Sequence, residues 1–381
     1  MKETLPLGRI GGTRIGLHWS VLVVVALVTG SLATGRLPDA EPGRPTWQYW
    51  GVALLTAALF LASLLVHELA HAVVARRDKV GVDGITLWML GGVARLSGEP
   101  PTPGAQARIA AAGPATSAAV GALGTVLALC VDAVHASALL VAAVAWTAAI
   151  NFVLAVFNAL PAAPLDGGRV LHAALWHHSG DRLRATRGAA GAGRLLGWVL
   201  MTTGFVVVLF VGDFAGIWSA LVGWFLISAA NAEERRATLH SALDGVPVRQ
   251  VMTRDLVTVP ATATLTAFLS EAPFGRYRHS AFPVVAADGT AAGLLTVRLV
   301  DRVPVTARGS TTAGEIAHRV PEVPATTPDE PVVDLLPRIE AARDHRALVL
   351  DEERRPVGIV TLTDVSRTLA WLSQATRLPS P

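Results

Sequence analysis

Charged residues are scarce in this 381-residue chain: they make up 16% of the sequence, whereas apolar residues make up 52%. Soluble domains carry about 25% charged residues, so the deficit indicates a membrane protein in contact with lipid. Lysine occurs only at Lys2 and Lys79, so arginine supplies nearly all the positive charge. The basic residues form no long block with interleaved aromatic side chains, and we therefore expect no nucleic-acid partner.

Cysteine is almost absent as well, because Cys130 is the single one and lies in an apolar run. One cysteine excludes an intrachain disulfide and any zinc site built from several cysteines. A metal site in this chain would have to use other ligands.

Long apolar runs dominate the first part of the chain. A membrane span needs roughly 20 mainly apolar residues. From about Glu233 onward the sequence becomes polar, interrupted by proline and alternating, as in a soluble α/β region. We therefore expect a polytopic α-helical membrane domain over residues 1–236, followed by a soluble α/β part. The predicted spans are 17–35, 50–75, 106–131, 136–160, 195–212 and 214–231.

Arginine placement orients these spans. Arginine-rich segments precede the first span, follow the second, fourth and sixth, and alternate with short loops that are poor in basic residues. Basic loops stay on the cytoplasmic side, so both termini and the soluble part are predicted to be cytoplasmic, in a bacterial cell membrane. In an alternative interpretation, Ser31-Leu32-Ala33 is a signal-peptide cleavage site. Cleavage there would not change the orientation of the other spans.

His67-Glu68-Leu69-Ala70-His71 stands inside the second apolar run. An ionisable side chain at the bilayer centre costs roughly 3 kcal/mol or more, so these three side chains need a partner. Residues four apart lie on one face of a helix, and both imidazoles can therefore bind one zinc ion. Glu68 is placed to take a proton from a zinc-bound water, whose pKa zinc lowers toward 7. The alternative is a degenerate remnant without metal.

A catalytic zinc usually takes three protein ligands, so a carboxylate or imidazole from elsewhere should complete the site. Asp166 is the candidate, in the stretch from Phe157 to Arg169 that closes the fourth span. The second and fourth spans both end on the cytoplasmic side, which brings Asp166 to the depth of His67 and His71. Taken alone, Pro-Leu-Asp-Gly-Gly would indicate a turn with a helix-capping aspartate.

H-E-x-x-H in one span, followed by N-x-x-P-x-x-P-L-D-G-G in a later one, resembles the site-2 protease family of intramembrane zinc metalloproteases. The resemblance covers the whole membrane part and implies His67, His71 and Asp166 as zinc ligands, with Glu68 as catalytic base. It also implies that Asn158 helps to hold the substrate or the oxyanion, for which an amide N–H is a suitable donor. The implied substrate is a single-span membrane protein, such as an anti-sigma factor, cut within or near its transmembrane segment.

Residues 81–98 lie between the two motifs and alternate loosely, but they are too broken to form a span. Irregular backbone at membrane depth is tolerated where it lines a cavity. We interpret this segment as a β-hairpin or re-entrant loop whose edge pairs with an unwound substrate segment. The alternative is a plain cytoplasmic connector.

Residues 245–305 and 306–372 are two rough copies of one pattern, each with an apolar strand pair whose second strand begins with glycine. A repeat of this size suggests stacked β-α-β-type units and resembles a tandem cystathionine-β-synthase (CBS) domain pair. Such pairs commonly bind adenine nucleotides, and the resemblance implies that Thr361 contacts phosphate and Asp364 the ribose. The first copy lacks the matching aspartate after Thr296. The alternative is a structural role, or a homodimer formed through these domains.

Other functional classes fit the same domain order. CBS pairs also follow transport domains, so a CBS-regulated channel or transporter is an alternative, and it predicts intramembrane charges along a pathway instead of a zinc site. A substrate-binding pseudoprotease is another. Neither central motif departs from the family's pattern, and an active protease modulated by its CBS pair is the prediction.

Overall fold

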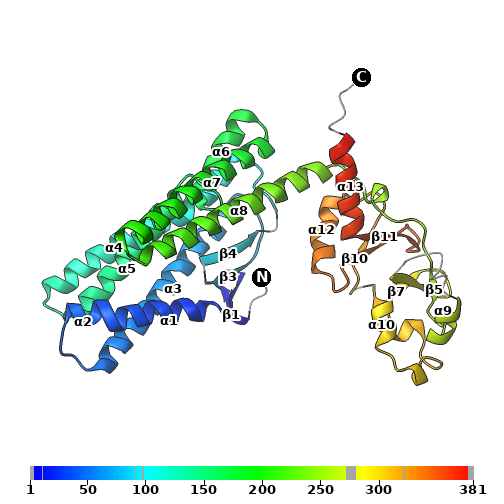
Figure 1. Cartoon of the computed structure of the whole chain (residues 1–381), viewed down its shortest axis with the longest axis horizontal. Coiled ribbons are helices and arrows are strands. Elements are labelled where there is room, and N and C mark those ends of the chain that lie inside the picture. The colour runs from blue at the N-terminus through cyan, green and yellow to red at the C-terminus, as the bar shows by residue number, and fades with distance from the viewer. Residues whose placement is uncertain are drawn as a thin grey trace. The chain divides into compact units, whose positions relative to one another are not determined.

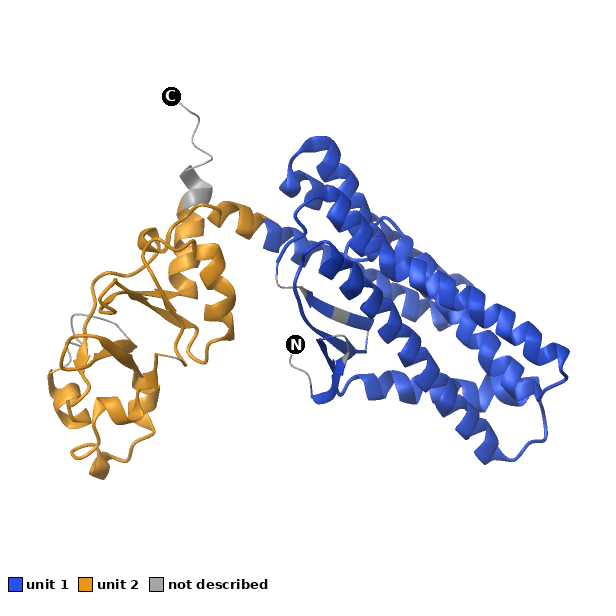
Figure 2. Cartoon of the chain, turned by 180° about the vertical axis from the view of Figure 1, so that it is seen from behind, with its two compact units in different colours: residues 1–237 blue, residues 238–381 orange. Residues whose placement is uncertain are grey.

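The structure is a computed structural model that divides the chain into two compact units, residues 1–237 and 238–381 (Figure 2). Figure 1 labels the helices and strands along the chain. Each unit is described by itself below. The structure describes residues 4–10, 12–89, 91–96, 98–271, 280–320 and 322–375.

Within the described residues, six helices of the first unit are long and apolar enough to cross a membrane. The polytopic helical membrane domain is therefore confirmed. Two of these spans contain a π-helical turn. The spans are α1 (Val21–Ser31) with η1 (Leu32–Arg36) and α2 (Leu37–Ala40), α3 (Thr46–Arg77), α4 (Pro103–Ala133), α5 (Ala138–Ala159), α7 (Arg182–Val206) with η2 (Val207–Val211), and α8 (Ala215–Leu243).

Three helices differ at their ends from the predicted spans, and the sixth, α8, continues from the predicted end at residue 231 to Leu243. Leu17 belongs to a strand, and α1 begins only at Val21, after a turn in which His18 Nδ1 lies 2.8 Å from Ser20 Oγ. The fifth span begins at Arg182 instead of residue 195, because the helix continues through a polar, arginine-containing segment before its apolar run. Hydropathy reports where lipid surrounds a helix, and a helix does not have to end where the lipid does.

A four-stranded sheet belongs to the same unit, with the order β1-β2-β3-β4. The pair β3/β4 is antiparallel, which confirms the hairpin predicted over residues 81–98. The N-terminal hairpin β1/β2, which joins β3 in parallel, was not predicted. The outer strands β1 and β4 form the two edges of this sheet. The strands are β1 (Leu5–Ile10), β2 (Thr13–Leu17), β3 (Val82–Trp88) and β4 (Gly91–Leu96).

One face of this sheet packs on the membrane helices. Ile85 and Leu87 of β3 are buried in a cluster with Val21 of α1 and with Leu64 and Ala72 of α3. Alternate residues of a strand point to opposite faces, so this face fixes the register of the sheet against α3. The hairpin β3/β4 is thereby held beside the helix that carries the H-E-x-x-H motif.

Small residues bring the helices close together. A Cβ on Gly124 of α4 would lie 3.0 Å from the Cβ of Ala148 on α5. The last two spans meet in the same way, because a Cβ on Gly197 of α7 would lie 2.7 Å from the carbonyl oxygen of Gly223 on α8. Larger side chains at these positions would push the helices apart.

The second unit contains two copies of one strand pattern, as the sequence predicts. In each copy a short strand joins in parallel an antiparallel pair, and that pair has a bulge near the end of its first strand. The first copy forms the sheet β5-β6-β7-β8 and the second the sheet β11-β10-β9. The strands are β5 (Val259–Pro260), β6 (Ala281–Val285), β7 (Ala291–Thr296), β8 (His318–Arg319), β9 (Ala325–Thr326), β10 (Arg346–Leu350) and β11 (Pro356–Thr361). The helices are η3 (Val248–Gln250), α9 (Leu265–Glu271), α10 (Val297–Asp301), η4 (Val305–Ala307), α11 (Ala313–Ile316), α12 (Val332–Ala341) and α13 (Leu362–Ala375).

Candidate metal centre

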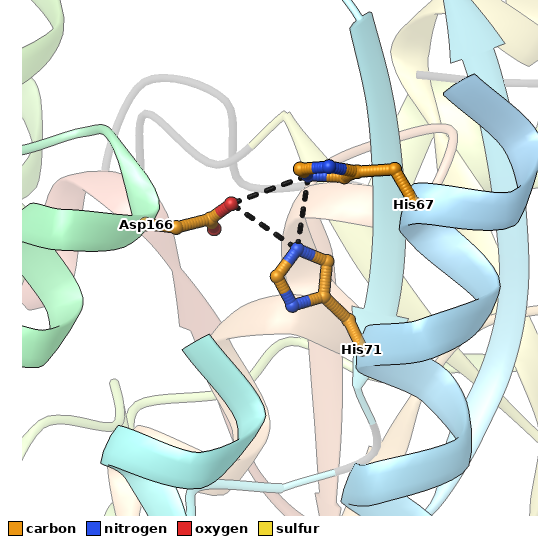
Figure 3. Close-up of side chains that lie close together, drawn as sticks. All are labelled: His67, His71 and Asp166. Atoms are coloured by element: carbon orange, nitrogen blue, oxygen red, sulfur yellow. Dashed lines mark hydrogen bonds and ion pairs between the residues drawn. The ribbon is translucent and has the colours of Figure 1, made fainter. Parts of the chain in front are cut away.

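His67 and His71 both project from one face of α3, as their spacing predicts (Figure 3). They are 3% and 8% exposed, and their Nε2 atoms lie 3.2 Å apart. Asp166 is the first residue of α6 (Asp166–Ser179), and its Oδ2 lies 3.3 Å from Nε2 of His67 and 3.2 Å from Nε2 of His71. The structure thus brings together three side chains that the sequence separates by up to 99 residues.

The spacing of these atoms fits one tetrahedral zinc ion. Zinc binds imidazole nitrogen and carboxylate oxygen at roughly 2.0–2.2 Å, so two ligand atoms on a tetrahedral ion lie about 3.3 Å apart. The three observed separations are 3.2–3.3 Å. Among the described residues this is the one group of three or more histidine, cysteine or acidic side chains with ligand atoms within 4.8 Å of one another.

The outer nitrogen of each imidazole is held by a hydrogen bond. His71 Nδ1 lies 2.7 Å from the carbonyl oxygen of Ile109, which can only accept, so this nitrogen carries the proton. His67 Nδ1 lies 2.9 Å from Ser117 Oγ, and we assign the same tautomer there. Both inner Nε2 atoms are then free to bind a metal, which is the usual arrangement for ligating histidine.

Asp166 faces the two imidazoles as an anion. Burial opposes its ionisation, but the interactions with His67 and His71 outweigh burial and hold the pKa of this carboxyl well below its usual range. Two nitrogen lone pairs and a carboxylate oxygen that converge at this distance need protons or a cation between them. Zinc satisfies all three at once, and its binding would release protons.

Two glycines leave room for this centre. A Cβ on Gly113 of α4 would lie 2.2 Å from His71 Nε2 and 2.5 Å from His67 Nε2. A Cβ on Gly92 of β4 would lie 2.2 Å from Cγ of Glu68. The structure gives a physical reason for glycine at position 113, because any side chain there would occupy the space between the ligands.

The chain between α5 and α6 carries Asp166 to the centre. A cis peptide bond joins Ala163 to Pro164, and the amide of Ala163 donates to the carbonyl oxygen of Ala189 on α7. Gly167 and Gly168 permit the close return of the chain: a Cβ on Gly167 would lie 2.3 Å from backbone oxygen atoms of the α5–α6 connection, and a Cβ on Gly168 would lie 2.4 Å from backbone atoms there. These two glycines therefore let the backbone approach the site.

Glu68 lies next to His67 on α3 and is 8% exposed. Its side chain packs against Gly92, which puts it between the metal-binding helix and the edge strand β4. A carboxylate at this place can exchange a proton with a water molecule at the centre, and it is not one of the three converging ligands.

Asn158 is the penultimate residue of α5 and is half-buried. Its Nδ2 donates to the carbonyl oxygen of Leu154, 3.1 Å away in the same helix, which uses one of its two amide hydrogens. The second hydrogen is available for a substrate carbonyl.

Sequence reasoning missed the contacts that support the site. Ser117 of α4 is 1% exposed and holds His67. Asn151 of α5 is fully buried, and its Nδ2 lies 3.1 Å from Ser63 Oγ on α3, one turn before His67. Both are small polar residues in apolar spans, which is a signal for an interhelical hydrogen bond, although the sequence does not say which helix accepts it.

Replacing Ser117 with alanine should weaken zinc binding by about 10- to 100-fold, the usual cost of removing a group that orients a metal ligand. The measurement is competition for zinc against a chelator of known affinity. Thr125→Ala is the matched control, because the Thr125 hydroxyl donates only to Gly121 in its own helix turn. Equal zinc affinity in the two variants would show that Ser117 does not position His67.

A third histidine, His172, lies on α6 outside the metal centre. It lies between Gln106 and Thr186, at 2.9 Å from Gln106 Nε2 and 3.1 Å from Thr186 Oγ1. It therefore links α6 to α4 and α7.

Thr361 and Asp364 form a helix cap in the second unit. Oδ2 of Asp364 accepts from the amide of Thr361 at 3.0 Å and from its hydroxyl at 2.7 Å, and the hydroxyl accepts from the Asp364 amide at 3.2 Å. Thr296 caps α10 in the first copy, where its hydroxyl accepts from the Leu299 amide. The threonine is thus a structural feature of both copies, and the carboxylate is present only in the second.

A cavity of about 400 Å³ adjoins this cap. It is lined by residues of both copies and contains two arginines and two aspartates. Its polar lining residues are Thr253, Asp255, Ser280, Arg346, Thr361, Thr363, Asp364 and Arg367.

Buried metal ligands in a membrane helix, with a carboxylate beside them and a third ligand from a later helix, define a membrane-embedded zinc metalloprotease centre. Comparisons with known proteins agree. The model of peptidase family M50 matches residues 55–136 and 126–203, and the CBS domain model matches residues 248–303 and 313–370.

Two relatives match nearly the whole chain. Rip3 of Mycobacterium tuberculosis, named as a zinc metalloprotease, is 42% identical over 97% of this chain and 93% of its own length. A Synechocystis protein with a zinc metalloprotease name, sll0528, is 26% identical over 97% of this chain and 96% of its own length. The solved site-2 protease of Methanocaldococcus jannaschii is 26% identical, covers 60% of this chain and 94% of its own, and has a TM-score of 0.42.

The chain belongs to peptidase family M50, the site-2 proteases, and carries a C-terminal pair of CBS domains. It is accordingly a multi-pass membrane zinc metalloprotease. This membership decides against the channel or transporter that the domain order also allowed.

Proposed function

We propose that this protease cuts a membrane-tethered protein within or near its transmembrane segment, with zinc held by His67, His71 and Asp166. The convergence of these three ligand atoms beside Glu68 carries the proposal. The substrate class is a single-span membrane protein, such as an anti-sigma factor whose release is regulated by proteolysis.

The residues of the site divide the chemistry between them. Zinc, when bound, would polarise the scissile carbonyl and lower the pKa of the attacking water, so that this water loses a proton readily at neutral pH. Glu68 accepts the proton of the attacking water and delivers it to the departing amine. Asn158 donates its second amide hydrogen toward the oxygen on which negative charge develops.

The edge strand β4 is the proposed docking place for the scissile segment. A transmembrane helix uses its amide groups internally, so the substrate must unwind before a carbonyl can reach the site. β4 is an edge strand and contacts Glu68 through Gly92. A substrate strand that adds to this edge satisfies its exposed backbone groups and lies beside the proton acceptor.

Cross-linking tests this docking. Cysteines are placed along the scissile segment of a trapped substrate and at Ala94 of β4, in a Glu68→Gln background in which Cys130 is replaced by serine. A docked strand should cross-link at every second substrate position, because side chains of a strand alternate. A repeat of 3.6 positions would show that the substrate stays helical and would overturn the edge-pairing proposal.

We also propose that both termini and the CBS pair lie in the cytoplasm of a bacterial cell, on the basis of the arginine-rich segments on one side of the spans. A cysteine placed at His135, between α4 and α5, should react with an impermeant maleimide added to intact cells. A cysteine at Gly180, between α6 and α7, should react only after the membrane is opened. The reverse pattern would invert the orientation.

For the CBS pair we propose binding of an adenine nucleotide in the cavity beside Thr361 and Asp364, which modulates cleavage. Two arginines in the lining, Arg346 and Arg367, suit phosphate, and Asp364 suits ribose hydroxyls. A homodimer formed through these domains is the alternative role.

Replacing Asp364 with alanine should weaken ATP binding to the full-length protein at least about tenfold, since a buried acceptor for hydroxyl groups is lost. Calorimetric titration with ATP in detergent measures this. Arg298→Ala is the control, because Arg298 lies in the first copy, one residue before Leu299, which is the equivalent of Asp364; this variant should bind as the wild type does. Absence of ATP binding by the wild type would favour the dimerising role, which light scattering can examine.

A further inference from the structure

Three arginines lie side by side across the four-stranded sheet of the first unit. Arg9 of β1 is opposite Arg14 of β2, Arg14 is opposite Gly84 of β3, and Gly84 is opposite Arg95 of β4. Residues in register point to the same face of a sheet. Accordingly, a Cβ on Gly84 would lie 3.6 Å from the Cβ of Arg14 and 3.8 Å from an Nη atom of Arg95. Arg9, Arg14 and Arg95 are called the arginine row below.

Among the described residues, no acidic side chain pairs with the arginine row. All three side chains are exposed, and within the described residues none of them takes part in an ion pair or a side-chain hydrogen bond. Like charges directly opposite one another destabilise a sheet. Adjacent strands lie about 4.8 Å apart, so the row concentrates three positive charges within about 15 Å. An anion bound to the row would offset this repulsion.

The strands place the arginine row at the level where the spans leave the bilayer. The turn between β1 and β2 lies beside the last turn of α3, since a Cβ on Gly12 would lie 3.8 Å from an Nη atom of Arg76. At the other end of the hairpin β3/β4, Gly92 lies against Glu68, two turns inside the same span. The sheet therefore runs from the membrane surface into the membrane, with the row at its surface end.

Three apolar side chains lie further along the sheet from the row and are exposed. Leu5 and Leu7 of β1 are 55% and 54% exposed, and Trp19, directly after β2, is 62% exposed. Guanidinium groups at the surface with apolar and aromatic side chains below them are the pattern of a protein surface in contact with lipid headgroups.

We propose that the arginine row binds the phosphate groups of anionic phospholipids at the membrane surface. Guanidinium binds phosphate oxygens in pairs, and three guanidinium groups in a line can bind adjacent headgroups. The lipid also offsets the repulsion among the arginines. The exposed leucines favour this partner over an acidic peptide, because a phospholipid offers acyl chains to them and an acidic peptide does not.

Titration of the delipidated full-length protein with short-chain phosphatidylglycerol in neutral detergent tests the proposal. Phosphatidylcholine of the same chain length is the neutral lipid control, inorganic phosphate the free anion, and a glutamate-rich peptide the acidic segment. Arg9, Arg14 and Arg95 are replaced together by glutamine. A triple change of the exposed Arg302, Arg319 and Arg354 in the second unit removes the same charge and serves as the matched control.

Phosphatidylglycerol should bind to the wild type and the matched control equally, and about fivefold more weakly for each arginine removed from the row. Without lipid, the row variant should unfold at the same or a higher temperature than the wild type, because repulsion is removed, and this shows that the variant is folded. Equal binding to row variant and control would overturn the proposal. So would equal affinity for inorganic phosphate, or preferential binding of the acidic peptide.

Discussion

Replacing Glu68 with glutamine should abolish cleavage while the protein keeps its fold and about one zinc per chain. The amide is nearly the same size, so it packs against Gly92 as the carboxylate does, but it cannot accept a proton from water. Loss of a general acid–base residue lowers the rate by about 10²- to 10⁴-fold. The measurement is cleavage of co-expressed single-span membrane proteins by wild type and variant, with zinc content of the purified proteins determined by mass spectrometry.

The control for this variant is Glu99→Gln. Glu99 is an exposed carboxylate before α4 that pairs with Arg182, the first residue of α7, and exposed ion pairs contribute little. The Glu99→Gln variant should cleave as the wild type does. A Glu68→Gln protein that still cleaves at the wild-type rate would contradict the assignment of the base. A wild type that binds zinc and substrate but never cleaves would be a pseudoprotease. When Glu68→Gln is inactive, the substrate that it traps can be identified.

Replacing Gly113 with alanine should remove zinc from the protein although every ligand is intact. The added methyl group would lie 2.2 Å from His71 Nε2 and 2.5 Å from His67 Nε2, and this is far inside ordinary contact distance. The imidazoles must move away from each other or from Asp166, so we expect zinc affinity to fall by more than about 100-fold, beyond the effect of losing a supporting hydrogen bond. Zinc content after dialysis against a chelator measures this.

Gly104→Ala on the same helix is the matched control. A Cβ there would meet only the flexible end of Arg108, at 3.4 Å. Alanine favours a helix over glycine by about 1 kcal/mol, so neither change should weaken α4 itself. If the Gly113 variant kept full zinc while the control did too, the centre would have to lie elsewhere than between the two imidazoles.

Several elements could be predicted because their signals are local. The spans are runs of apolar residues, and the His67–His71 pair follows from the 3.6-residue turn of a helix. Asp166 could be predicted as the third ligand because topology brings the ends of two spans to the same depth in the membrane. A carboxylate beside two glycines stands out at the end of the second of these spans. The strand pairs of the second unit repeat along the chain, and repetition is itself a local signal.

Other elements could not be predicted in this way. The strands β1 and β2 are short, and β2 passes into the turn before α1, so a hydropathy window merges its end with the span. The register that aligns Arg9, Arg14 and Arg95 joins strands from two distant parts of the chain. A shift of one residue would have sent these arginines to opposite faces.

The sequence by itself determined that this chain is a membrane protein with two histidines spaced to bind one metal ion, a neighbouring carboxylate and a repeated soluble domain. Those features depend on hydropathy and on the geometry of a single helix. Only the tertiary structure decided that Ser117 and the carbonyl of Ile109 fix the imidazoles, that Gly113 leaves space between them, and that three arginines share one face of a sheet. Such contacts join residues tens of positions apart, and their distances depend on how whole helices and strands pack, which no local pattern records.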